Sequence, residues 1–146
     1  MTSHGIRASG IALSGVAFGA LVLLAAAPQD KVERGKYLVD RALLCSDCHT
    51  PADAKGMPDK TRLLLGAPIM FKPTVPVPAW ADTAPALAGL VGYTDAHIVR
   101  ALTTGVGPTG YALRPPMPPY RLSTEDAEAV VAYLKTLKRK PAAPKR

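Results

Sequence analysis

The run Cys45–His49, which reads C-S-D-C-H, constrains this chain more than any other feature, because it contains both of the chain's cysteines. The pattern C-x-x-C-H is the attachment sequence for covalently bound haem. Two thiols on one helical turn can form thioethers with the two vinyl groups of a single porphyrin. The imidazole of His49 then lies under the iron as its proximal ligand. One motif predicts one haem.

Two other kinds of site share the C-x-x-C spacing. A redox dithiol of the thioredoxin type is expected beside a βαβ pattern, which this sequence lacks. Structural zinc takes four protein ligands, and the chain offers only the two thiols and His4, His49 and His97. The first of these histidines lies in a segment that we expect to be removed or held in a membrane. Haem attachment is therefore the interpretation that we favour.

The first 27 residues have the pattern of a secretory signal. Arg7 is the only lysine or arginine before Lys31, and the apolar stretch Ile11–Ala27 ends in three alanines. At 17 residues this stretch is at the lower limit for a membrane span. Cleavage is favoured for that reason, although an uncleaved N-terminal membrane anchor remains open. Because bacteria attach haem to such motifs outside the cytoplasm, we expect a periplasmic protein, either soluble or anchored to the outer face of the inner membrane.

The rest of the chain is long enough for one small domain, residues 28–139, followed by a basic tail, residues 140–146. The formal charge of +7 is concentrated at the C-terminus, where five basic residues follow position 137. Residues 28–137 contain 12 basic and 11 acidic residues, for a net charge of +1. No basic patch interleaved with aromatic residues argues for nucleic acid binding. Aromatic residues make up only 5% of the chain, so we expect the porphyrin to supply much of the core.

Three segments have the pattern of amphipathic helices. The first runs from about Lys31 to Leu44, with Asp30 as the expected N-cap. The second is Thr94–Thr104, closed by Gly105. The third follows Ser123, an expected N-cap, and its apolar residues repeat at helical spacing up to Leu137. The long connection from residue 50 to residue 93 contains seven prolines and shows no strand alternation. A loop of this length must wrap something, and a haem is the candidate.

A second axial ligand decides whether the iron carries electrons or reacts with small molecules. Met117 is the first candidate, since prolines on both sides hold its backbone within the segment Arg114–Pro119. Met70 is the second. Met57 lies too close to the haem motif, in a polar stretch, and His97 falls on the polar side of the second helix.

These residues resemble a monohaem class I cytochrome c, similar to the bacterial haem modules associated with periplasmic dehydrogenases. The resemblance covers about residues 30–139 and rests on six runs besides the haem motif: GKYLV at 35–39, LLLGAP at 63–68, IVRALTTG at 98–105, PMP at 116–118, LSTED at 122–126 and YLKTL at 133–137. Thr50 departs from the family, in which glycine commonly follows the haem histidine. The proline-rich insertion between residues 70 and 86 is a second departure.

The resemblance implies an all-α class I cytochrome c fold, with three main helices and a long proline-rich loop wrapped around one covalent haem c. It implies that His49 and Met117 ligate the iron, that the carbonyl of Pro68 accepts a hydrogen bond from His49, and that Gly35 lies near Tyr133. The function so implied is one-electron transfer between redox protein partners, with no catalytic residue. The alternatives are an electron-accepting haem subunit of a periplasmic dehydrogenase or oxidase complex, and a haem peroxidase or gas-binding protein.

Overall fold

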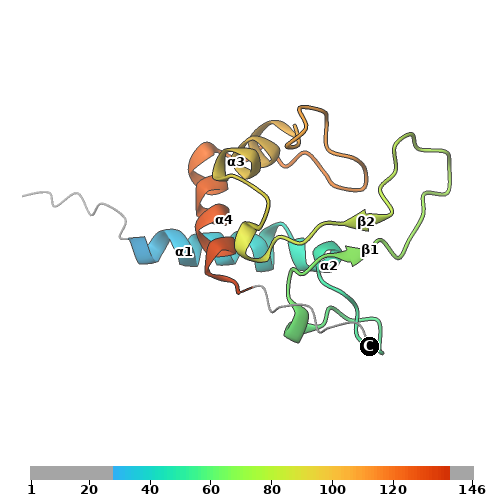
Figure 1. Cartoon of the computed structure of the whole chain (residues 1–146), viewed down its shortest axis with the longest axis horizontal. Helices are drawn as coiled ribbons and strands as arrows, with labels where there is room; N and C mark the ends of the chain where they lie inside the picture. The colour runs from blue at the N-terminus through green and yellow to red at the C-terminus, as the bar shows by residue number, and fades with distance from the viewer. Residues whose placement is uncertain (1–27, 139–146) are drawn as a thin grey trace, which may run out of the picture.

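The computed structural model describes residues 28–138 of the chain (Figure 1). The expected signal or anchor, residues 1–27, and the basic tail, residues 140–146, lie outside the described residues. The longer helices of this part are α1 (Pro28–Tyr37), α3 (Asp95–Thr104) and α4 (Thr124–Thr136). None of the described helices is long and apolar enough to cross a bilayer.

The first expected helix is broken into three pieces. Helix α1 starts at Pro28, a residue suited to a first helical turn, so the expected cap Asp30 lies inside the helix. It continues into a π-helical turn, η1 (Leu38–Ala42). Leu44 then adopts a left-handed conformation (φ 51°), which ends the turn and starts the short helix α2 (Cys45–His49). The break gives the haem motif its own helical turn instead of the end of a long helix.

Helices α1 and α4 cross in close contact, and Gly35 lies at the crossing. A Cβ atom at Gly35 would lie 1.9 Å from the carbonyl oxygen of Ala129 and 2.9 Å from Cβ of Tyr133. Only glycine permits this approach, which confirms the expected neighbourhood of Gly35 and Tyr133. Two ion pairs join the same helices, Lys31 with Glu128 at 2.7 Å and Arg34 with Asp126 at 2.8 Å.

The expected caps of the other two helices are confirmed. The Thr94 hydroxyl accepts a hydrogen bond from the His97 backbone N–H (3.2 Å), and Gly105 closes α3 with φ 74°. The Ser123 hydroxyl accepts from the Asp126 N–H (3.1 Å) at the start of α4. Both helices bury apolar faces in a core whose largest fully buried side chains are Leu64, Leu134, Val39 and Val130.

The connection from residue 50 to residue 93 contains more regular structure than expected. It carries two 3₁₀ turns, η2 (Lys60–Arg62) and η3 (Ala88–Leu90), and two short strands, β1 (Ala67–Pro68) and β2 (Thr83–Ala84). The strands pair antiparallel, with Ala67 opposite Ala84. A ladder of two residues requires no alternating pattern, so the sequence gives no sign of it. Between the strands the chain makes a long excursion that projects from the body (Figure 1).

Candidate haem site

Helix α2 holds both cysteines. Cys45 is buried and Cys48 is half-buried, and neither forms a disulfide. Burial raises the pKa of the Cys45 thiol to about 12, and burial together with the neighbouring carboxylate of Asp47 raises the pKa of Cys48. A reactive redox dithiol has a lowered thiol pKa instead. The environment of the two sulfurs is therefore unlike that of a thioredoxin-type site.

The His49 ring is oriented by the chain itself. The ring is buried, with 6% exposed, and its Nδ1 lies 2.7 Å from the carbonyl oxygen of Pro85. Because a carbonyl only accepts hydrogen bonds, Nδ1 carries the proton and Nε2 keeps its lone pair. This is the arrangement that orients a metal-binding histidine. Burial lowers the pKa of His49, partly offset by the Pro85 bond, which favours the neutral imidazole that binds a metal.

The expected hydrogen-bond acceptor for His49 is wrong. Pro68 lies in β1 and pairs with Thr83 across the two-stranded ladder. The residue that reaches the ring, Pro85, comes directly after β2. The β1 side contacts the histidine backbone, where the carbonyl of His49 accepts a hydrogen bond from Gly66 N–H (2.7 Å). Both prolines border the same ladder, and only the tertiary fold determines which carbonyl meets the ring.

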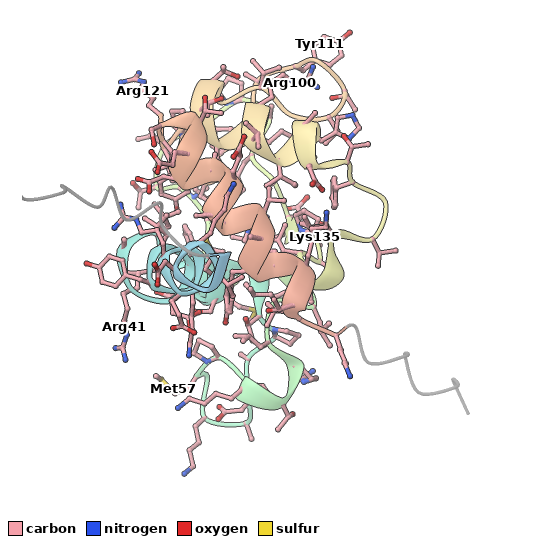
Figure 2. All side chains as sticks on the ribbon, turned by 90° about the vertical axis from the view of Figure 1, so that its left-hand side faces the viewer. Arg41, Met57, Arg100, Tyr111, Arg121 and Lys135 are labelled. Carbon is pink, nitrogen blue, oxygen red and sulfur yellow. The ribbon has the colours of Figure 1, made fainter. Side chains whose placement is uncertain are left out.

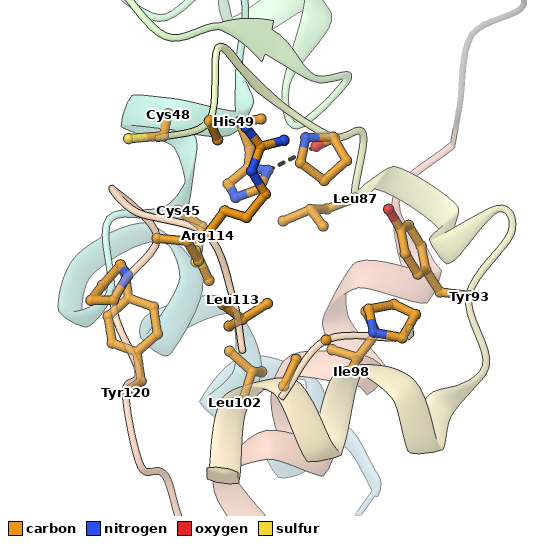
Figure 3. Close-up of a pocket in the computed structure, with 18 of the residues that line it drawn as sticks. Cys45, Cys48, His49, Leu87, Tyr93, Ile98, Leu102, Leu113, Arg114 and Tyr120 are labelled. Atoms are coloured by element: carbon orange, nitrogen blue, oxygen red, sulfur yellow. Dashed lines mark hydrogen bonds between the residues drawn. The ribbon is translucent and has the colours of Figure 1, made fainter. Parts of the chain in front are cut away.

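A cavity of about 320 Å³ opens beside α2 and α3 (Figure 3). Apolar side chains form most of its wall, among them Ile98 and Leu102 of α3 and Leu134 of α4. Cys45, Cys48 and His49 all line it. An apolar cavity with two thiols and an oriented imidazole in its wall fits a covalently attached porphyrin, whose flat ring is largely apolar.

The methionines differ sharply in position. Met117 is half-buried, lines this cavity and packs against the core. Met70 is 81% exposed and lines a different hollow, formed with the segment that follows the haem motif. Met57 is 62% exposed and protrudes from the molecule at the end opposite Tyr111 (Figure 2). Among the methionines of the described chain, Met117 alone lines the cavity that also contains His49.

His97 differs from the expectation of a solvated side chain. It is half-buried and lines the cavity. Its Nδ1 accepts a long hydrogen bond from the Thr94 backbone N–H (3.4 Å), which makes it the second half of the α3 capping box. A structural role at the helix start accounts for this ring.

Two polar residues near Met117 were missed by sequence reasoning. Arg114 lines the cavity, and its guanidinium binds the carbonyls of Ala79 and Trp80. Tyr120 also lines the cavity, and its hydroxyl donates to the carbonyl of Leu43 at 2.7 Å. Burial raises the pKa of Tyr120 to about 12. Their closeness in sequence to Met117 was the only available signal, and it did not reveal their partners.

The cytochrome c family model matches residues 32–138, which include the haem motif, the cavity wall and α4. The chain belongs to the cytochrome c family. The mostly helical structure confirms the class I cytochrome c fold. Membership of the cytochrome c family implies a covalently bound haem c and haem-based electron transfer with redox partners.

A curated relative, a diheme cytochrome c-type protein of Cereibacter sphaeroides, is 31% identical to this cytochrome c over 115 residues. The alignment covers 75% of this chain and 36% of the relative. The chain thus spans about a third of the length of the relative. The relative's name describes two haems, whereas the present sequence contains a single C-x-x-C-H motif.

Proposed function

We propose that this cytochrome c is a one-electron carrier with a single covalent haem c, ligated by His49 and Met117. One observation carries the proposal. Met117 lines the same cavity as Cys45, Cys48 and His49, whereas Met57 and Met70 point elsewhere. A His/Met-ligated haem cycles between Fe(II) and Fe(III) without an open coordination position.

Each site residue has a distinct role in this proposal. The sulfurs of Cys45 and Cys48 hold the porphyrin through thioethers. His49 offers Nε2 to the iron because Pro85 occupies Nδ1. Met117 offers its thioether from the opposite loop, where its backbone N–H binds the carbonyl of Arg114 (3.1 Å). The mostly apolar wall would limit the water around a bound haem and so would limit reorganisation during electron transfer.

Two other functions remain as alternatives to a free electron carrier. The greater length and second haem of the Cereibacter sphaeroides relative favour a role as an electron-accepting haem subunit or module of a larger complex, such as a periplasmic dehydrogenase or oxidase. Co-purification with such a partner distinguishes that role from a free shuttle. A peroxidase or gas-binding protein requires an open or easily opened iron, which ligation by Met117 disfavours.

The proposal includes location and processing. We propose that residues 1–27 direct the chain to the periplasm, as a cleaved signal or a retained anchor, that residues 28–139 form the cytochrome c domain, and that residues 140–146 are a basic tail. The mass of the intact purified protein tests the processing and the haem content. It reports whether one haem has been added and whether the N-terminal segment has been removed.

The test of the axial pair is a comparison of alanine variants. Met117→Ala should open the sixth position, lower the reduction potential and allow carbon monoxide to bind the reduced iron, because water is a harder ligand than a thioether. The fold should persist, since both thioethers and His49 remain. Met57→Ala and Met70→Ala are matched controls at exposed methionines and should leave the spectrum unchanged. If Met70→Ala opens the iron and Met117→Ala does not, the axial assignment is wrong.

A further inference from the structure

The excursion between β1 and β2, residues 69–82, has two limbs that are tied together near their base. The backbone N–H of Ile69 donates to the carbonyl of Asp82 at 2.8 Å. The rings of Phe71 and Trp80 meet edge to face, with centroids 5.7 Å apart. These contacts fix the returning limb, residues 79–82, relative to the ladder.

Three hydrogen bonds join this returning limb to the distal loop, residues 114–118. Arg114 donates from Nε to the carbonyl of Ala79 (2.9 Å) and from Nη2 to the carbonyl of Trp80 (2.7 Å). The third bond runs in the opposite direction, from the N–H of Ala81 to the carbonyl of Pro115 (2.7 Å). Three consecutive residues of the limb thus bind two consecutive residues of the loop.

The backbone of Ala79 is turned into the left-handed region, with φ 57°. This conformation is unfavourable for a residue with a Cβ atom and persists where surrounding contacts hold it. The contact at this point is the bond from Nε of Arg114 to the carbonyl of Ala79. Charge-assisted bonds from a guanidinium are stronger than neutral ones.

The same stretch of chain continues through β2 to Pro85, whose carbonyl binds His49. Residues 79–85 therefore contact the ring of one expected axial ligand and the loop of the other. We infer that Arg114 is a positioning residue, which fastens the distal loop to the proline-rich excursion and so holds Met117 where it would ligate the iron. The inference rests on the proposed ligation by Met117. It gives a role to the proline-rich insertion between residues 70 and 86, most of which lies in this excursion.

A competing role for Arg114 is a purely electrostatic one. Arg114 lines the cavity (Figure 3), so its charge alone could act on a bound haem or its carboxylates. Lysine separates the two roles, because it keeps the charge but lacks the planar fork that reaches two carbonyls. A neutral ligand of the iron, such as imidazole, separates the two roles again. Its affinity responds to opening of the distal loop more than to the charge of residue 114.

The experiment measures imidazole binding to the oxidised holo-protein, in competition with the Met117 sulfur. Apparent affinity rises with the fraction of molecules whose loop is open. Arg114→Lys and Arg114→Gln should each raise the apparent affinity by about tenfold. Ala79→Pro should act in the same direction without altering Arg114, because proline cannot adopt φ 57° and must turn the carbonyl away.

Arg62→Gln is the matched control. Arg62 also binds a backbone carbonyl, that of Ala52 at 2.9 Å, but in the segment after the haem motif. It should keep wild-type imidazole affinity, and all variants should keep wild-type haem content and helical circular dichroism. The weak methionine–iron band of the oxidised form should diminish in the Arg114 and Ala79 variants only.

Contrary outcomes separate the two proposals. If Arg114→Lys and Ala79→Pro both bind imidazole like wild type while Met117→Ala binds it tightly, the positioning role is wrong and His/Met ligation stands. An effect of Arg114→Gln alone would replace positioning with a charge effect. If wild type and Met117→Ala bind imidazole equally, Met117 is not the ligand and both proposals fall.

Discussion

The residues Cys45, Cys48 and His49 all line one cavity, because the short helix α2 presents the three of them to it. That they form one site could be predicted from spacing alone, since the C-x-x-C-H run places them on one helical turn, while their role in haem attachment stays a prediction. The carbonyl that accepts a hydrogen bond from His49 could not be predicted. Which carbonyl reaches Nδ1 depends on how the chain leaves a two-residue ladder, and nothing in the sequence distinguishes Pro85 from Pro68 in that respect.

Replacement of the cysteines tests haem attachment at the scale of single residues. Cys45→Ala or Cys48→Ala should severely lower the yield of holo-protein, because one thioether and part of the core constraint are lost together. The double variant should contain no covalent haem in a haem-stained denaturing gel. Ser46→Ala, between the two cysteines, is the matched control and should stain like wild type. Normal staining of the double variant would refute attachment at this motif.

At the scale of elements, the ends of α3 and α4 follow from local signals in the sequence. Thr94, Ser123 and Gly105 are caps whose chemistry is local, and each could be predicted. The break between α1 and α2 could not be predicted, because the left-handed conformation of Leu44 has no glycine or proline to mark it. The paired strands were missed for a similar reason, since two residues are too few to show a period.

The crossing of α1 and α4 predicts a large effect of Gly35→Ala. Its Cβ would meet the Ala129 carbonyl, a backbone group that cannot rotate away. We expect a loss of at least about 2 kcal/mol in the free energy of unfolding of the holo-protein, measured by denaturant titration. Gly107→Ala is the control, because its Cβ would meet Leu113 at an ordinary 3.5 Å. Equal stability of the two variants would contradict the close crossing.

The ion pair between Arg34 and Asp126 predicts a pH dependence of the same crossing. The hydrogen bond from Arg34 holds the pKa of Asp126 below its ordinary value of 3.8. A carboxylate with a lowered pKa stabilises the folded state above that ordinary value, and the contribution is lost as pH falls through the folded pKa. Unfolding titrations of wild type and Asp126→Asn should therefore converge in stability below pH 3.8. A constant difference across this range would exclude the pair as a contributor.

At the scale of the whole molecule, the cavity occupies the place that core side chains would fill in a domain without a cofactor. Its wall brings together α2, α3, α4 and the distal loop, so the haem is expected to complete a core that the chain leaves thin. The sequence indicated this through its few aromatic residues and many prolines. It did not indicate that the proline-rich insertion contacts the distal loop, because those bonds join residues that are far apart in the chain.

The central claim is that each chain carries one haem, whose iron has two protein ligands and no open position, and that this haem transfers one electron. Its most direct test is a spectroelectrochemical titration of the purified wild-type protein, with haem content measured per chain, in the absence and presence of carbon monoxide. We predict one covalent haem, a single one-electron wave, and an unchanged reduced spectrum and midpoint under carbon monoxide at neutral pH. A carbon monoxide adduct that shifts the spectrum and raises the midpoint would contradict the account and indicate an open, reactive iron.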